Sequence, residues 1–438
     1  MRILIFSTSY LPFIGGAELA IKEITDRIPA LSFTLITARF TRAVPTHERI
    51  GNVDVYRVGL GYSFDKWLLP WLGLGHGKRL NAVEPFDIAW SMMASQASIA
   101  AAWFKKAFPA KKLVLTLQEG DEEEHLKRYV FGNDFLYRLL IRRWHAAVFK
   151  HADIITAISE YLAARARKNL SLQQEGSLAR VEVIPNGVNV ERFKIYDLRF
   201  KNEELRNSIG FRPEDKIIIT TSRLVKKNGI QDLIESLQYL PAHIKLLICG
   251  VGPLESSLKL AANRYMLNDR VRFLGHIPHT KLPRYLHGSD IFCRPSLSEG
   301  MGSSFIEAMA AGLPVIATPV GGIPDFLHSP SILSKGGLEG GGGNEEEKHP
   351  FSNSHAVPRS EPSPRGSTTG ELENRWGERI TGLFCKVGNP EDIAEKIQLL
   401  LTNNNLRQRI IENGSKMVRE KYLWEGIAER MKDVLTKK

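Results

Sequence analysis

Short runs of hydrophobic residues recur along the first part of the chain, and polar turns or helical patterns separate them. Where apolar residues return at helical intervals, as over residues 17–28, the pattern predicts an amphipathic helix. The alternation of strand-like and helical patterns predicts a parallel α/β sheet. The expected strands lie at residues 3–6, 33–37, 53–58, 86–90, 113–117, 154–158 and 181–184.

A second series of the same kind follows, and residues 189–215 separate it from the first. This separating stretch is polar and charged without strong periodicity, so we place a domain boundary there. The fold class predicted is α/β, with two doubly wound parallel-sheet domains that face a cleft. The strands expected in the second domain lie at residues 216–221, 244–249, 271–274, 291–293 and 315–317.

Three helical patterns, at residues 390–401, 406–422 and 424–435, end the chain. Residues 329–378 differ from the rest, because they are rich in glycine, proline and serine and almost lack large apolar side chains. That composition predicts a disordered insertion in a loop of the second domain. The domains expected are therefore 1–195, 206–421 with this insertion, and a C-terminal helix at 422–438.

Composition narrows the classes of partner. A chain of 438 residues exceeds one ordinary domain, and 43% hydrophobic residues suffice for a core. The net charge of +11 favours acidic partners such as nucleic acid, anionic lipid or phosphorylated substrates. Three well-separated cysteines, Cys249, Cys293 and Cys385, indicate buried thiols in a reducing compartment. The N-terminus is expected to be a first strand and not a signal peptide, and no run reaches the length of a membrane span.

Residues 290–319 read as strand, turn, helix, turn and strand. Glu299 and Glu307 flank the expected helix start, where the amides of Gly302, Ser303 and Ser304 lack helical acceptors. Free amides at the positive end of a helix bind phosphate, and a carboxylate suits vicinal hydroxyls. The stretch therefore suggests a sugar-nucleotide site. Without its surroundings, two glutamates that merely complement the helix dipole would be the simpler interpretation.

Two further stretches fit the same chemistry. Gly15 and Gly16 stand at a strand-to-helix turn, where the backbone can approach a ligand closely. Arg223 ends a strand, and Lys226 and Lys227 follow it closely. Such cations could neutralise a diphosphate leaving group, although a solvated basic turn would have the same sequence.

Taken together, these motifs closely resemble the GT-B-fold retaining glycosyltransferases of family 4, known as glycosyl transferases group 1. The resemblance covers nearly the whole chain except the insertion. The spacing of Glu299 and Glu307 is its most specific part. The other matching segments are residues 15–18, 184–188, 222–225, 250–254, 270–275 and 321–323.

The resemblance implies an acceptor-binding first domain and a second domain that binds the nucleotide sugar. It implies that Glu307 binds the ribose hydroxyls and that Glu299 contacts the donor sugar. Arg223 and Lys227, with Lys226 as the weaker alternative, would stabilise the diphosphate. Six further donor-binding residues complete the expected set. They are Gly15, Gly16, Ile277 and the helix start Gly302–Ser304.

The chain departs from the family pattern at two positions. Asn228 stands where the usual lysine directly precedes a glycine, which shifts the expected cation to Lys227. Gln118 stands where related enzymes often have a histidine near the sugar. Glutamine cannot act as a general base, so only a hydrogen-bonding role on the acceptor side is expected for Gln118.

Two other patterns are rejected as sites. Residues 73–79 resemble a phosphate-binding loop, but the spacing is one residue short and Arg79 replaces the required serine or threonine. The acidic run at residues 121–125 lacks the form used by metal-dependent transferases and is better explained as a solvated helix start. No metal and no cofactor are therefore expected, apart from the UDP- or GDP-linked sugar itself as substrate.

The expected activity is a metal-independent hexosyl transfer to a hydroxyl of a glycan or lipid-linked acceptor, as in cell envelope polysaccharide or glycolipid synthesis. The alternatives are a nucleotide-sugar epimerase on the same fold and a non-catalytic sugar-nucleotide binding protein. No nucleic-acid-binding module is present, so nucleic acid is not an expected partner. The basic helical pattern at 134–150 and the aromatic run at 66–72 fit an anionic membrane surface, although an ordinary domain helix explains each as well. The protein is expected in the cytoplasm, peripheral to the inner membrane face.

Overall fold

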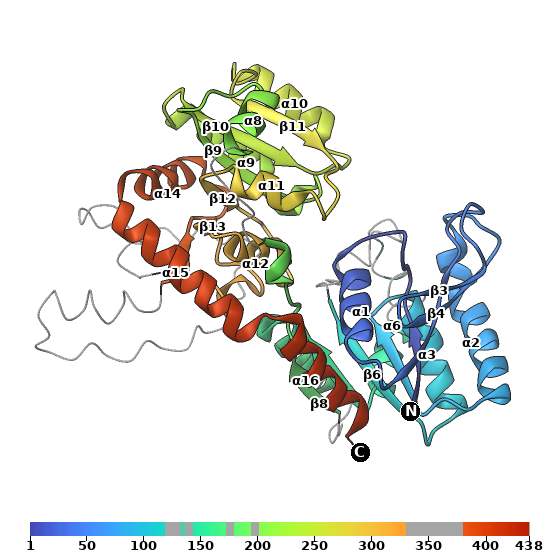
Figure 1. Cartoon of the computed structure of the whole chain (residues 1–438). Helices are drawn as coiled ribbons and strands as arrows, with labels where there is room; N and C mark the ends of the chain where they lie inside the picture. The colour runs from blue at the N-terminus through green and yellow to red at the C-terminus, as the bar shows by residue number, and fades with distance from the viewer. Residues whose placement is uncertain are drawn as a thin grey trace, which may run out of the picture.

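The computed structural model describes residues 1–118, 133, 135, 143–171, 179–193, 201–329 and 380–437. These residues form two α/β domains, each built on a parallel sheet with helices packed against it (Figure 1). The predicted fold class is confirmed. The disorder predicted for 329–378 and the acidic run at 121–125 fall almost entirely outside the described residues.

The first sheet has eight strands, and β1 lies near its centre between β2 and β5. Neighbouring strands are parallel except for β3 and β4, which pair antiparallel at one edge. All predicted strands of this domain are confirmed, and only β3 was not predicted. In sheet order the strands are β3 (His47–Ile50), β4 (Val53–Val58), β2 (Ser32–Ala38), β1 (Arg2–Phe6), β5 (Ile88–Met92), β6 (Lys112–Leu117), β7 (Ile154–Ala157) and β8 (Arg180–Val183).

Among the described residues up to 193, five α-helices belong to this domain, and α2 accounts for the glycine-rich segment at residues 73–79. The segment is helical, so it is not a phosphate-binding loop. Gly77 lies over the sheet, where an added Cβ would be 3.3 Å from Leu4 and 3.4 Å from Phe6. The missing side chain therefore lets the helix pack closely on β1. The helices are α1 (Gly16–Asp26), α2 (Asp65–Val83), α3 (Gln96–Ala107), α6 (Arg143–His151) and α7 (Glu160–Ser171).

The second sheet has six strands, and every neighbouring pair is parallel. Its last two strands, β13 and β14, lie side by side although residues 318–382 separate them along the chain. The five predicted strands are confirmed, whereas β14 was not predicted. In sheet order the six strands are β11 (Val271–Gly275), β10 (Ile244–Cys249), β9 (Lys216–Thr221), β12 (Ile291–Arg294), β13 (Val315–Ala317) and β14 (Leu383–Phe384).

Two helices, η3 and α8, lie within residues 189–215, where the sequence showed no strong hydrophobic periodicity. Helix α8 belongs to the second domain, because Arg206 bonds to Asp290 at 3.1 Å. The helical elements of the second half are η3 (Val190–Phe193), α8 (Lys201–Ser208), η4 (Lys226–Asn228), α9 (Ile230–Ser236), η5 (Leu237–Tyr239), α10 (Glu255–Arg264), α11 (Leu282–His287), α12 (Ser303–Ala310), η6 (Ile323–Asp325), α14 (Pro390–Thr402), α15 (Asn404–Lys421) and α16 (Trp424–Thr436).

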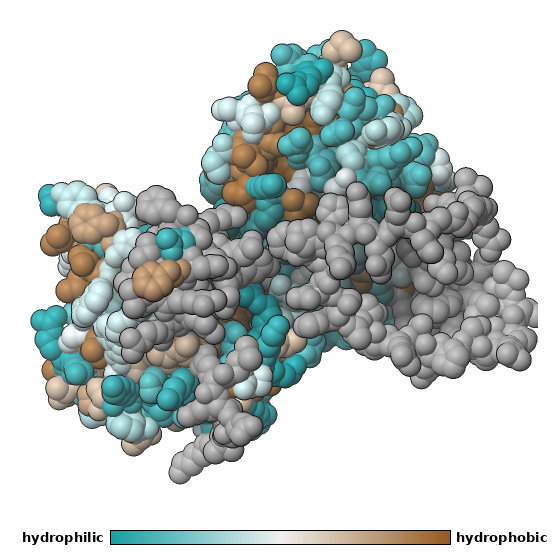
Figure 2. Space-filling view, turned by 180° about the vertical axis from the view of Figure 1, so that it is seen from behind, coloured by the Kyte–Doolittle hydropathy of each residue, from teal (hydrophilic) through white to brown (hydrophobic). Residues whose placement is uncertain are grey.

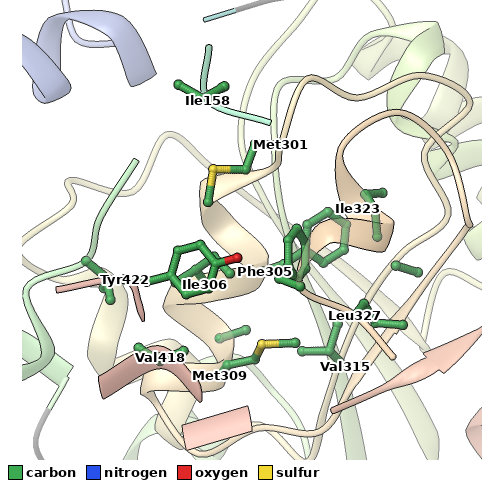
Figure 3. Packing of buried hydrophobic residues seen from close by; sticks show 14 of the residues in the cluster. Ile158, Met301, Phe305, Ile306, Met309, Val315, Ile323, Leu327, Val418 and Tyr422 are labelled. Atoms are coloured by element: carbon green, nitrogen blue, oxygen red, sulfur yellow. The ribbon is translucent and has the colours of Figure 1, made fainter. Parts of the chain in front are cut away.

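Helix α12 is at the centre of a hydrophobic core that reaches both domains. Phe305 is fully buried, with its ring 5.4 Å from that of Phe292 and at a steep angle to it. At the other end of this core, Met301 lies next to Ile158 of the first domain (Figure 3). This contact holds the start of α12 close to the first sheet.

The three cysteines are buried free thiols, as predicted. Burial raises the pKa of each thiol, and that of Cys249 reaches about 12. Among the helices of the described residues, none combines the length and apolar character needed to cross a membrane.

The chain returns to the first domain at its C-terminal end, so that both termini lie there (Figure 1). Trp424 begins α16 and is buried against Gly187, where an added Cβ would lie 2.7 Å from the indole. The amide of Val188 donates to the carbonyl of Tyr422 at 2.7 Å. Helix α16 then packs on α1 within one hydrophobic core.

Replacing Trp424 with alanine removes the large side chain that fills the joint between α16 and the first domain. We expect Trp424→Ala to lower the free energy of unfolding by about 3 to 5 kcal/mol, the usual cost of emptying a buried aromatic site. Chemical denaturation would measure this loss. Trp71→Ala is the matched control, because Trp71 is 63% exposed and should leave stability almost unchanged. Equal stability of both variants would contradict the packing role of Trp424.

Candidate active site

A cavity of about 1040 Å³ lies between the two domains, at the carboxyl ends of strands from both sheets. It brings together most of the residues that the sequence analysis selected. Lys227 and Ile277 are the two selected residues that do not line it. The selected residues in its lining are Gly15, Gly16, Gln118, Arg223, Glu299, Gly302, Ser303, Ser304 and Glu307.

The N-terminus of α12 forms the polar floor of the cavity. Gly302 is its N-cap residue and has φ +87°, a left-handed conformation that favours glycine. A Cβ at this position would also lie 2.5 Å from the Phe305 ring. Glycine is thus required for the helix to begin here with Ser303 and Ser304 in its first turn. The amides of that turn point along the positive end of the helix dipole.

Glu299 is held by Arg294, a residue that the sequence analysis did not select. Arg294 is only 5% exposed, and its guanidinium forms an ion pair with Glu299 and donates to Ser304 Oγ at 2.8 Å. Burial lowers the pKa of Arg294, and the carboxylates of Glu299 and Glu307 oppose this shift. An arginine at the end of an otherwise buried strand was the available signal, because such a charge requires a partner.

Glu307 is also held in place, by His279. Nε2 of His279 lies 2.7 Å from Glu307 Oε1, and Arg192 Nη1 lies 2.6 Å from the other ring nitrogen. Neither Arg192 nor His279 was selected from the sequence. His279 follows the loop that was expected to border the base, but nothing local indicates that it reaches Glu307.

The first domain contributes the turn before α1 and a buried amide pair. Gly15 is the N-cap residue of α1, and Glu18 in the next turn accepts a hydrogen bond from Ser9. Gln118 and Asn186 form two reciprocal hydrogen bonds of 3.0 and 2.7 Å, and both are buried. Gln118 therefore holds Asn186, which the sequence analysis noted only as part of a motif.

The departure at Asn228 has a structural explanation. Asn228 is buried, and its side-chain amide donates to the carbonyl of Arg223 at 2.6 Å. It thus stabilises the turn that carries Arg223 into the cavity lining. The neighbouring carbonyl of Lys227 accepts from the amide of Leu297 at 2.7 Å, which ties the turn to the loop before Glu299.

One hydroxyl beside this turn points to a polar ligand. Thr221 ends β9 and lines the cavity. Its Oγ1 is buried and has no hydrogen-bond partner among the described residues. A buried polar group without a partner is costly, and a ligand group could supply the missing bond.

The wall opposite α12 is apolar and aromatic. Trp71 on α2, Trp103 on α3 and Trp144 on α6 pack edge to face, with ring centroids 5.8 and 5.2 Å apart. Trp67 also lines the cavity, and both Trp67 and Trp71 are substantially exposed. We call Trp67, Trp71, Trp103 and Trp144 the tryptophan wall. Figure 2, which views the molecule from the side opposite to Figure 1, shows hydrophobic residues at the outer edge of the first domain as well.

The two segments considered for membrane binding both contribute to this wall. The aromatic run at residues 66–72 lies in α2 and is exposed at Trp67 and Trp71, as its sequence indicated. Of the basic pattern at 134–150, the structure describes residue 135 and the part within α6, and α6 contributes Trp144.

Arg294→Met would leave the Glu299 carboxylate without its buried partner. We expect a loss of about 3 to 5 kcal/mol in the free energy of unfolding, as for other broken buried ion pairs. Urea denaturation would measure it, with Arg264→Met, which removes an exposed arginine on α10, as the matched control. Adding Glu299→Gln to Arg294→Met should restore part of the stability. No loss in the single variant would show that the pair is unimportant for folding.

Two family models match the chain. Residues 14–192 match the model described as Glycosyltransferase Family 4, and residues 201–331 match Glycosyl transferases group 1. An uncharacterized glycosyltransferase of Methanocaldococcus jannaschii is 23% identical over 99% of this chain and 98% of its own. A GDP-mannose-dependent monoacylated alpha-(1-6)-phosphatidylinositol monomannoside mannosyltransferase of Corynebacterium glutamicum is 29% identical. That match covers 51% of this chain and 60% of the relative.

A second uncharacterized glycosyltransferase of M. jannaschii is 27% identical over 58% of this chain. The chain spans 53% of this relative, so it matches little more than half of either protein.

Solved structures share the whole fold. Sucrose-phosphate synthase from Thermosynechococcus elongatus superposes with a TM-score of 0.71 at 18% identity, over 99% of this chain and 98% of its own. HepE from Anabaena, in complex with UDP and glucose, gives 0.70 at 17% identity over 100% of both chains. At these identities the likeness concerns the fold. Because the models match both domains and the fold agrees throughout, the chain belongs to the group 1 glycosyltransferases and has the GT-B fold.

Proposed function

We propose that the protein is a retaining, metal-independent glycosyltransferase. It moves a sugar from a UDP- or GDP-linked donor to a hydroxyl of a glycan or lipid-linked acceptor. The observation that carries this proposal is the single cavity in which the N-terminus of α12, Glu307, Glu299 and Arg223 face the Gly15–Gly16 turn. No cofactor takes part beyond the nucleotide sugar.

The second domain has the groups that a nucleotide sugar requires. The diphosphate fits the first-turn amides of α12 and the Arg223 guanidinium, which together offer donors and positive charge. Glu307 is an acceptor-only carboxylate suited to the ribose hydroxyls, and Thr221 offers a hydroxyl that lacks a partner. Relatives support this ligand class, because HepE was solved with UDP-glucose and the C. glutamicum relative is named as GDP-mannose-dependent.

The chemistry that fits these groups is front-face transfer. The bond between the anomeric carbon and the diphosphate breaks, and the acceptor oxygen bonds to the same face. The acceptor proton passes to a diphosphate oxygen, so charge balances on the leaving group. Arg223 and the α12 amides, which line the cavity, stabilise that charge. Glu299 is paired with Arg294 and Glu307 is bonded to His279, which disfavours a covalent glycosyl-enzyme route through either carboxylate.

The tryptophan wall supports an acceptor with an apolar portion. Indole rings offer a large apolar surface at low entropic cost, and here they line the side of the cavity that faces the donor groups. The name of the C. glutamicum relative includes a phosphatidylinositol monomannoside. We therefore favour a lipid-linked acceptor in cell envelope or glycolipid synthesis. The enzyme would work in the cytoplasm, bound peripherally to the anionic inner face of the membrane, for which its net charge of +11 is suited.

Donor binding and transfer should separate in two variants. Glu307→Ala removes the ribose acceptor and should weaken donor affinity by about 10- to 100-fold, the range for a hydrogen bond to a charged group. Arg223→Ala should mainly slow transfer, by about 100-fold, because its charge is needed most as the diphosphate leaves. Calorimetry with UDP and GDP, and turnover with the nucleotide sugar that stabilises the fold best, would measure these effects.

Exposed residues of the second half provide the controls for this pair. Glu412→Ala and Arg409→Ala on α15 should keep both affinity and turnover. If Glu307→Ala and Arg223→Ala also behaved like the wild type, the assignment would fail. A product that is an epimerised nucleotide sugar, without a new glycoside, would instead identify an epimerase.

Trp71→Ala tests the acceptor side. It should raise the KM for a lipid-linked acceptor about tenfold and leave the donor KM within about twofold, because the indole contacts only the first-domain side of the cavity. The reference is a water-soluble acceptor with the same sugar and no lipid, for which the KM should not change. Equal effects on both acceptors would show that the wall recognises the sugar and not the lipid.

A further inference from the structure

Four polar side chains connect the first domain with Glu307. Glu23 on α1 forms an ion pair with Arg192 Nη2 at 3.6 Å. Arg192 in η3 contacts His279 at 2.6 Å, and His279 in the loop before α11 contacts Glu307 on α12 at 2.7 Å. These four residues come from four separate elements, and we call them the Glu23–Glu307 chain.

The direction of each hydrogen bond in this chain follows from the groups involved. A guanidinium can only donate, so Nδ1 of His279 accepts the hydrogen bond from Arg192. The proton of the neutral ring is then on Nε2, which donates to Glu307 Oε1. The ring orientation and its tautomer are thus set by Arg192, and the position of one Glu307 oxygen is set by the ring.

Further contacts hold the Glu23–Glu307 chain in place at both ends and at His279. Glu23 is largely buried and also accepts from Arg27 Nη1 at 2.5 Å, so its carboxylate cannot turn freely. The His279 ring meets the buried Phe193 ring edge to face, with centroids 6.2 Å apart. Glu307 itself keeps only 13% of its side chain exposed. These contacts leave the carboxylate one orientation in which it can present its second oxygen to the cavity.

We propose that His279 and Arg192 are positioning residues that hold Glu307 for the donor and couple donor binding to the approach of the two domains. The inference rests on the proposed function, in which Glu307 binds the nucleotide. A preorganised carboxylate binds without first losing rotational freedom, so it binds more tightly. Because Arg192 pairs with Glu23 of the first domain and contacts His279 of the second, the arrangement that holds Glu307 best is the one in which the domains are close.

Two variants of His279 and one control variant test the proposal. His279→Phe keeps a ring of similar shape but removes both hydrogen bonds, and it should raise the donor KM and the Kd for UDP or GDP about tenfold with kcat within about twofold. His279→Gln can accept from Arg192 and donate to Glu307, so it should restore values close to the wild type. His243→Phe replaces an exposed histidine outside the cavity and should have no effect. A purely structural role would lower stability in His279→Phe without changing KM.

A double-mutant cycle separates this inference from the proposed function. In a Glu307→Ala background, His279→Phe should cause no further loss of affinity, because it acts through Glu307. If Glu307→Ala alone kept full affinity, the donor assignment itself would fail. If Glu307→Ala lost affinity while His279→Phe kept it, or if His279→Gln were as poor as His279→Phe, only the positioning role would be overturned.

The coupling to domain approach has its own readout. Small-angle scattering should show that the wild type becomes more compact when the nucleotide is added at saturation. Arg192→Met cuts the link to Glu23 and should reduce that change, while Arg212→Met, at an exposed site, should not. A wild-type response in Arg192→Met would overturn the coupling.

Discussion

The buried ion pair between Arg294 and Glu299 is the interaction on which the second-domain side of the cavity depends. Arg294 ends β12, and its guanidinium reaches the start of α12 through Ser304 and the loop through Glu299. A charge so deeply buried is stable only with its partners in place. The pair therefore fixes the loop, the helix start and the carboxylate relative to the sheet. The left-handed Gly302 completes the turn that this arrangement needs.

The two sides of the cavity are lined by different kinds of side chain. On the second domain, Glu299 and Arg223 lie in short turns and Glu307 lies on α12, and each of the two carboxylates has a fixed partner. On the first domain, the tryptophan wall presents rings that contact one another and few directional groups. Directional groups discriminate between similar polar ligands, whereas apolar surfaces tolerate variation. A strictly selected nucleotide and a more variable acceptor would be the natural outcome.

The sequence predicted the strands and the strand-turn-helix unit of residues 290–319 well, because both depend on local patterns. Buried parallel strands are continuous apolar runs, and the spacing of Glu299 and Glu307 lies within one strand-turn-helix unit. β3 was missed because residues 47–50 are mostly polar and pair only at a sheet edge. A polar run at an edge carries no strand pattern that can be recognised.

The missed site residues have a different cause. Arg192, His279 and Asn186 acquire their roles from partners far away in the chain, and no spacing rule links them. The substitution at Asn228 looked like a change in catalytic detail, yet its amide supports the turn that carries Arg223. Whether Lys227 takes over the role of the usual lysine stays a prediction.

The return of the chain to the first domain gives the molecule two adjacent connections between its halves. One passes through η3, and the other joins α15 to α16, and the two are tied by the hydrogen bond between Val188 and Tyr422. A single connecting segment would let one domain rotate about several axes relative to the other. Two connecting segments that are hydrogen-bonded to each other leave mainly one hinge axis for rotation of the domains. Opening and closing of the cavity between the domains would then follow one path. Each closure would return α12 to the same place opposite Gly15 and Gly16.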